Sequence, residues 1–136
     1  MCKVNSSLYA GGKAFVAKTN VARGESHWNP NTDVYVTDDS LVIKVELAGM
    51  RREDLELTID GHRLLICGHR QDGCRAPKCK FMVMEINYGA FECVIEVPAA
   101  YDLGQAKAAY HNGFLRVDVP LGVSAPKRLA IPASED

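Results

Sequence analysis

Short stretches of alternating apolar and polar residues recur along most of this chain, and each predicts a half-buried β-strand. The clearest one covers residues 41–47, where every second side chain is Leu, Ile or Val and the intervening ones include Lys44 and Glu46. Further strands are expected at about residues 33–37, 55–59, 63–67, 81–87, 91–97, 106–111 and 115–119.

Turn signals separate these strands at intervals of roughly 8–12 residues. Asn112-Gly113 is typical of a two-residue type I′ hairpin turn, because both residues tolerate positive φ, and Asp60-Gly61 is a second hairpin signal. Only short helical turns are expected, near residues 50–54 and 101–105. About eight short strands with almost no helix predict an all-β fold, an immunoglobulin-like β-sandwich.

One predicted strand, in residues 81–86, is apolar on both faces except for Glu85. A strand of this kind requires cover on both sides or a partner along its edge. Two explanations remain open: a central strand of its own sheet, or a strand that pairs with another molecule. On the strand predicted at residues 91–97, Cys93 shares a face with Phe91 and Ile95, so its side chain is expected to be buried.

Composition excludes several classes of function. The chain has 136 residues, 47% of them hydrophobic and 24% charged, which suits one globular domain. A net charge of −1 gives no basis for electrostatic binding of nucleic acid or of an anionic membrane surface. No apolar run approaches the roughly 20 residues of a membrane span. The first 15 residues contain no continuous apolar stretch, so no secretory signal is expected and the cytoplasm is the expected location.

Five cysteines are an odd number, which argues against a closed disulfide framework and favours free thiols in a reducing compartment. His69, Cys74 and Cys79 lie in or beside one predicted loop, and Cys67 just precedes it. Structural zinc sites usually bring their ligands in close pairs such as C-x2-C, whereas the spacing here is H-x4-C-x4-C, so no metal site is expected. A thiol-regulated module remains an alternative, in which Cys74 or Cys79 pairs within the loop or across a dimer on oxidation.

Catalysis is not indicated. The four histidines accompany no recognisable nucleophile motif, and no Gly-rich phosphate-binding loop is present. The acidic residues Glu53 and Asp54 adjoin Arg51 and Arg52, a charge run typical of a solvated turn. We therefore expect no enzyme activity, no catalytic residue and no cofactor.

Three motifs, in order, carry a resemblance to a known family. The stretch AAYHNGFLRVDVP resembles a signature A-x-x-x-N-G-x-L, and NYGAFECVIEVP resembles Y-G-x-F-x-R-x-x-x-L-P. Near the C-terminus, Leu129-Ala130-Ile131 resembles an Ile-x-Ile anchor. Together, from Trp28 to Ile131, they resemble the α-crystallin domain of small heat-shock proteins, of the bacterial and plant type. The residues of the signature hairpin are Ala108, Asn112, Gly113 and Leu115.

The resemblance implies a β-sandwich that holds partly unfolded client proteins without ATP and associates with copies of itself. It implies three regions: an N-terminal arm over residues 1–27, the sandwich domain over 28–121, and a C-terminal extension over 122–136. It also implies that Leu129 and Ile131 anchor one subunit in an edge groove of a neighbour. A strand exchanged with the partner subunit is implied for Phe81, Met82, Val83, Met84, Glu85 and Ile86.

The chain departs from the family pattern at Cys93, where the family typically has an arginine that helps to hold the dimer by charge pairing. The dimer contact must therefore be organised differently or be weaker. Two other interpretations stay open: Leu129 and Ile131 pack on their own domain, or the chain is an adaptor sandwich that docks onto a larger ATP-driven chaperone. Adaptors of that kind lack the exchanged strand and the tail anchor.

Overall fold

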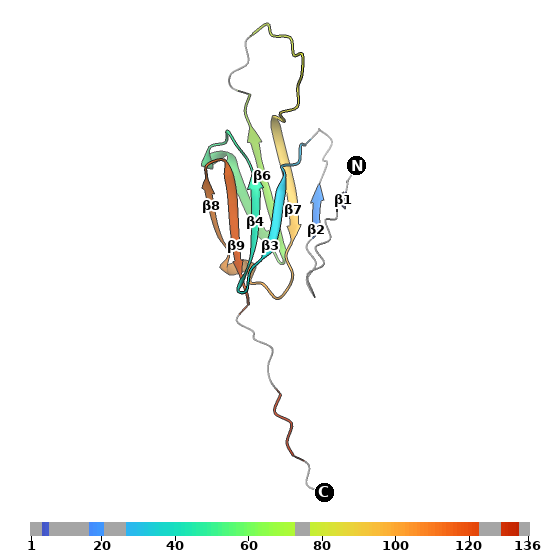
Figure 1. Cartoon of the computed structure of the whole chain (residues 1–136), viewed down its shortest axis with the longest axis vertical. Coiled ribbons are helices and arrows are strands. Elements are labelled where there is room, and N and C mark those ends of the chain that lie inside the picture. Colours follow the sequence, from blue (N-terminus) through green and yellow to red (C-terminus); the bar gives the residue numbers. More distant parts are fainter. Residues whose placement is uncertain (1–3, 6–16, 21–26, 73–76, 123–128, 134–136) are drawn as a thin grey trace.

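The computed structural model describes residues 4–5, 17–20, 27–72, 77–122 and 129–133. In this part of the chain, two antiparallel sheets lie face to face (Figure 1). One sheet has the strand order β1-β2-β7-β6-β5 and the other β3-β4-β9-β8. The elements are β1 (Val4–Asn5), β2 (Ala17–Asn20), β3 (Thr32–Val36), β4 (Ser40–Glu46), η1 (Arg52–Asp54), β5 (Leu55–Asp60), β6 (Arg63–Arg70), β7 (Gly89–Glu96), η2 (Leu103–Gln105), β8 (Lys107–His111) and β9 (Phe114–Pro120). The predicted β-sandwich is confirmed.

The core lies between the two sheets and follows the predicted alternation. On β4, Leu41, Ile43 and Val45 are fully buried, while Lys44 and Glu46 are exposed. Val42 departs from the alternation, since it lies on the other face of β4 and is fully buried as well. Cys93 is fully buried as expected. The other core residues that are at most 3% exposed are Leu47, Leu64, Ile66, Phe91, Ile95, Val97, Leu103, Leu115, Val117 and Val119.

The hairpin between β8 and β9 has the predicted turn. Asn112 and Gly113 both have positive φ, +50° and +82°, and His111 pairs with Phe114 on either side of them. Left-handed backbone at both positions is what a type I′ turn requires. The turn also contacts the C-terminal end of β4, where the N–H of Leu47 donates to the Gly113 carbonyl at 2.7 Å.

A close contact between β6 and its neighbours requires glycine at position 68. A Cβ on Gly68 would lie 2.4 Å from the Asp54 carbonyl oxygen and 2.8 Å from Cζ of Phe91. The Phe91 ring occupies this space and packs against Trp28, with ring centroids 5.1 Å apart. Trp28 therefore closes the end of the sandwich at which β6 and β7 are joined by residues 71–88.

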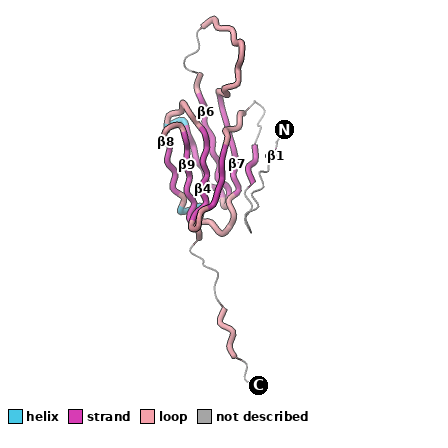
Figure 2. The backbone as a smooth tube through the Cα atoms, in the orientation of Figure 1, coloured by secondary structure: helices cyan, strands magenta, loops and turns pink. Residues whose placement is uncertain are grey.

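Two regions differ from the sequence prediction. The pattern gives no strand in residues 1–27, yet Val4–Asn5 forms β1 and Ala17–Asn20 forms β2, which pairs with β1 and with β7. Most of the remaining residues of the predicted arm lie outside the described residues. Conversely, the strand predicted at 81–87 does not form within the single chain, where these residues belong to a loop (Figure 2). The interpretation of 81–86 as a central strand of its own sheet is therefore wrong.

Candidate binding surfaces

An apolar groove of about 300 Å³ lies where the two sheets end side by side, between the edge strands β5 and β8. Leu57 on β5 pairs with the core residue Ile66, so its side chain is directed inward, yet it is 37% exposed because no strand of the described chain lies beyond β5. The residues that line the groove are Arg52, Leu55, Leu57, Ala108, Ala109, Tyr110 and Leu115.

The signature hairpin forms the β8 wall of this groove. The Cα partner of Ala108 is the core residue Val117, so Ala108 faces inward, and its small side chain leaves space in the groove. Tyr110 is held by its hydroxyl, which donates to the Leu47 carbonyl at 2.5 Å and accepts from the Met50 N–H at 3.3 Å. The hairpin thus fixes a rigid apolar recess. Sequence reasoning identified the hairpin but missed the β5 wall, although the alternation through residues 55–59 gave its inward face.

The 81–86 segment leaves most of its apolar surface in solvent. Met82 is 88% exposed and Val83 74%, and the segment forms no strand of either sheet. It lies in the connection between β6 and β7, which extends beyond the end of the sandwich (Figure 1). The other exposed fractions are 46% for Phe81, 57% for Met84 and 62% for Ile86. Exposed apolar surface of this extent marks an interaction site.

The edge strand β3 is available for such an interaction. It pairs with β4 on one side, and among the described residues no strand pairs with its other side. Tyr35 and Val36, which alternate between its two faces, are 38% and 37% exposed. An edge of this kind offers unpaired backbone donors and acceptors to an incoming strand.

The tail anchor also lies in solvent. Leu129 is 82% exposed and Ile131 is 92% exposed. The interpretation that these two side chains pack on their own domain is therefore wrong for the described chain. Residues 123–128, which join them to the domain, lie outside the described residues.

Cys93 occupies an apolar site that a lysine approaches from β2. Lys18 pairs with Ile95, so the lysine shares a face with Cys93, and its Nζ donates to the Pro30 carbonyl at 2.6 Å. Burial lowers the pKa of Lys18. Burial raises the pKa of the Cys93 thiol to about 11, against the opposing influence of the Lys18 ammonium. Cys93 is thus a neutral core residue that makes no charge pair of its own.

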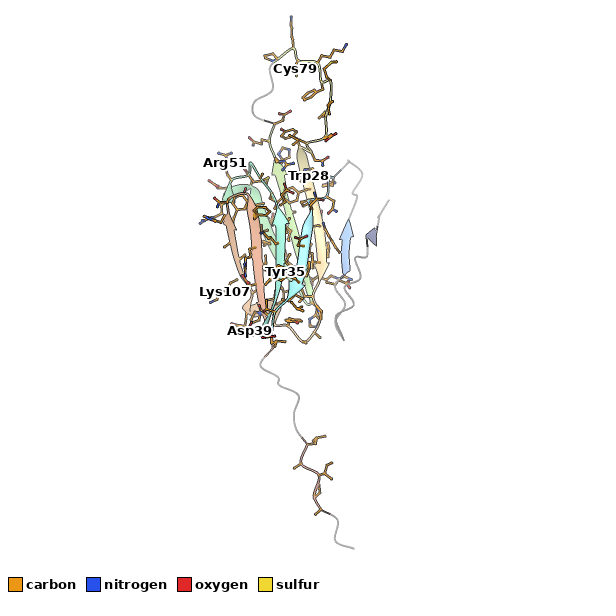
Figure 3. All side chains as sticks on the ribbon, in the orientation of Figure 1. Trp28, Tyr35, Asp39, Arg51, Cys79 and Lys107 are labelled. Atoms are coloured by element: carbon orange, nitrogen blue, oxygen red, sulfur yellow. The ribbon has the colours of Figure 1, made fainter. Side chains whose placement is uncertain are left out.

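The other described thiols differ in exposure. Cys79 is exposed on the projecting connection (Figure 3), whereas Cys67 is half-buried. Burial raises the pKa of Cys67, and the carboxylates of Glu56 and Glu92 raise it further. Among the described residues no three His, Cys, Asp or Glu side chains are grouped closely enough to hold a metal ion. Cys74, which the alternative thiol site requires, lies outside the described residues.

These environments predict an order of thiol reactivity. At pH 8, a pKa of about 11 leaves roughly one Cys93 thiol in a thousand as the reactive thiolate. Among these three thiols, peptide mass spectrometry after timed treatment with iodoacetamide should therefore find Cys79 alkylated first, Cys67 more slowly and Cys93 only after unfolding in urea. Alkylation of Cys93 in the native protein at the rate of Cys79 would contradict the buried position.

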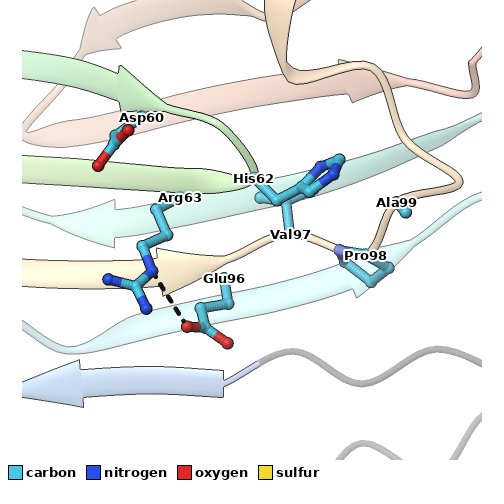
Figure 4. A pocket seen from close by; sticks show the side chains of 7 residues that line it. All are labelled: Asp60, His62, Arg63, Glu96, Val97, Pro98 and Ala99. Atoms are coloured by element: carbon cyan, nitrogen blue, oxygen red, sulfur yellow. Dashed lines mark ion pairs between the residues drawn. The ribbon is translucent and has the colours of Figure 1, made fainter.

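A second, larger pocket of about 500 Å³ lies at the β5–β6 hairpin and has a mixed lining of charged and apolar side chains (Figure 4). Arg63 and Glu96 form an ion pair across it at 3.2 Å, with both side chains more than half exposed. Solvent screens a pair of this kind, so it contributes little to stability. Its lining combines these charged groups with Val97, Pro98 and Ala99, and it brings together no recognisable set of catalytic residues.

None of the described helices has the length and apolar character needed to cross a bilayer.

Comparisons with known proteins agree with this geometry. Residues 33–132 match the Hsp20/alpha crystallin family. Small heat shock protein C2 of Rickettsia felis is 30% identical over 96 residues, and the match covers 71% of this chain but only 62% of that protein. The 16.9 kDa class I heat shock protein 3 of Oryza sativa is 31% identical over 108 residues, which cover 78% of this chain and 72% of the relative. The crystal structure of hspA from Xanthomonas axonopodis has a TM-score of 0.66 at 26% identity, covering 74% of this chain and 100% of that one.

Proposed function

The chain belongs to the Hsp20/alpha crystallin family, and from this premise we propose that it is an ATP-independent chaperone that binds partly unfolded proteins and prevents their aggregation. One observation carries the proposal: a well-packed sandwich leaves two apolar segments and an apolar groove in solvent. A protein with a closed core gains nothing from such surfaces unless other chains cover them.

The first surface is used for dimerisation. The 81–86 segment of one subunit adds to β3 of its partner, where the backbone has unpaired donors and acceptors. In this position its two apolar faces cover Val36 on the inner side and Tyr35 on the outer side of the partner's sheet. The exchange accounts for a sequence that predicts a strand yet forms none within its own chain.

The second surface is used for assembly beyond the dimer. Leu129 and Ile131 of one subunit enter the β5–β8 groove of a neighbour, where Leu57 and Ala108 provide apolar walls. Burial of the two side chains contributes roughly 1.5–3 kcal/mol each. Ordering the tail offsets much of this, so each contact is weak and the assembly depends on several contacts together. Because each contact is weak, grooves open readily for clients.

The chemistry is binding alone, with no catalytic residue and no cofactor. Clients expose apolar side chains when they unfold, and the groove and the 81–86 segment offer matching surface. The two exposed segments favour this function over that of an adaptor for an ATP-driven chaperone, which would have no use for them. The proposed division into an arm over 1–27, a domain over 28–121 and an extension over 122–136 follows from the same scheme.

We place the protein in the cytoplasm. The described cysteines, Cys67, Cys79 and Cys93, are all free thiols, which suits a reducing compartment. The partners are other copies of the chain and unfolded proteins. A net charge of −1 gives no support for nucleic acid or membrane partners.

Light scattering from a heat-labile enzyme tests the chaperone function. Equimolar chain should suppress the rise in scattering at the denaturing temperature, equally with and without ATP, because no chemical step is involved. An unrelated β-sandwich protein at the same concentration serves as control. Unchanged scattering at stoichiometric amounts would remove the chaperone function while leaving the fold assignment intact.

A further inference from the structure

Arg70 joins four parts of the chain at the point where the 71–88 connection leaves the sandwich. It is the last residue of β6 and pairs with Gly89, the first residue of β7. Its Nε and Nη2 donate to the Asn87 carbonyl at 2.8 and 2.5 Å, and its Nη1 donates to the Ala48 carbonyl at 3.2 Å. The guanidinium thus ties the far end of the connection to both β6 and the turn after β4.

Two aromatic rings hold the guanidinium in place. Its Cζ lies 4.2 Å from the ring centroid of Trp28 and 5.6 Å from that of Tyr88. Trp28 is fixed in turn, since its indole Nε1 donates to the Gly89 carbonyl at 3.0 Å. A planar cation that stacks on rings and donates several hydrogen bonds at once is a role that arginine fills and lysine does not.

These contacts act directly on the 81–86 segment, because Asn87 and Tyr88 follow Ile86 without interruption. Because the two residues are held against the end of β6, the direction in which the segment leaves the sandwich is restricted. A connection released at this end would sample many directions, and docking on a partner would have to order it first. Preorganisation of the exit therefore strengthens association without a new contact to the partner.

We propose that Arg70 is a positioning residue for self-association, which sets the direction in which the 81–86 segment is offered to a second copy of this chain. The inference rests on the proposed strand exchange and adds to it the residue that prepares the segment. The fluorescence of Trp28 reports on this cluster, since Trp28 is the one tryptophan of the chain.

Sedimentation equilibrium of Arg70→Lys, Arg70→Gln and the unchanged 136-residue chain tests the proposal. Both variants should raise the dimer dissociation constant about tenfold or more, because the paired charge-assisted hydrogen bonds to Asn87 are lost. Trp28 emission should change in both variants. The matched control is Arg63→Gln at the other end of β6. It removes only an exposed ion pair with Glu96, so the dimer dissociation constant should stay within about twofold of the wild-type value.

The dissociation constants of the variants and of the wild type distinguish the role of Arg70 from strand exchange itself. Folded Arg70 variants with a wild-type dissociation constant would overturn the positioning role and leave strand exchange untouched. A wild type that stays monomeric at every concentration would overturn strand exchange itself, and the role of Arg70 with it. If Arg70→Gln loses the β-sheet signal in circular dichroism, Arg70→Lys, which keeps the charge and the aliphatic stem, decides the question.

Discussion

Replacing Val83 by proline is expected to convert the dimer into a folded monomer. Val83 is in the middle of the 81–86 segment, and proline there cannot donate to the partner's strand and disturbs the pairing on either side. Each ladder bond that is lost or left unsatisfied costs roughly 1–3 kcal/mol, which corresponds to an increase of about tenfold to a hundredfold in the dimer dissociation constant. Sedimentation equilibrium measures this constant directly.

The sandwich itself should be unaffected by this change. Val83 is 74% exposed and contributes to neither sheet, so the thermal midpoint of the monomer should match that of the parent at concentrations where both are dissociated. Lys78→Pro is the matched control, because it introduces the same residue into the same connection but outside the segment. A Val83→Pro protein that dimerises like Lys78→Pro would show that strand pairing does not hold the dimer.

Replacing Leu129 and Ile131 together by alanine is expected to reduce any larger assembly to dimers. The change removes most of the apolar surface that the tail offers, roughly 1.5–3 kcal/mol for each side chain before the cost of ordering. Because the assembly depends on many such contacts together, a modest loss at each one is multiplied. Light scattering coupled to size exclusion would report the mass, and the dimer should persist since the 81–86 segment is intact.

Two further variants locate the acceptor of the tail. Ala108→Glu places a charged side chain in the β5–β8 groove and should give the same dimers, because the recess is filled and made polar. Pro132→Ala, one residue beyond the anchor, should keep the parental mass. If the double alanine variant keeps the parental mass as well, Leu129 and Ile131 are not the anchor.

The sequence predicts most of this fold because local rules agree with the final packing. The alternation on β4 gives its buried face correctly, and Asn112-Gly113 gives both the turn type and the register of β8 with β9. Burial of Cys93 also follows from the alternation it shares with Phe91. In each case the partners lie on the same strand or on the adjacent one, so the pattern contains the required information.

The remaining features depend on partners that are distant in the sequence or absent from the chain. Strand β2 has the sequence AKTN, which carries no apolar alternation, and it becomes a strand because the edge of β7 pairs with it. Residues 81–86 have the opposite property, a strand-like sequence without a neighbour in the same chain. The contacts of Arg70 join Trp28, Ala48 and Asn87, and no local pattern indicates that these positions meet.

Native mass spectrometry of the 136-residue chain over a range of concentrations tests most directly whether copies of the molecule cover one another's exposed apolar segments and sheet edges. The polypeptide has a mass of 14.9 kDa. Even multiples of that mass should dominate, with subunits exchanging when two isotopically distinct preparations are mixed. A species of 14.9 kDa alone at every concentration would contradict both the exchanged strand and the docked tail.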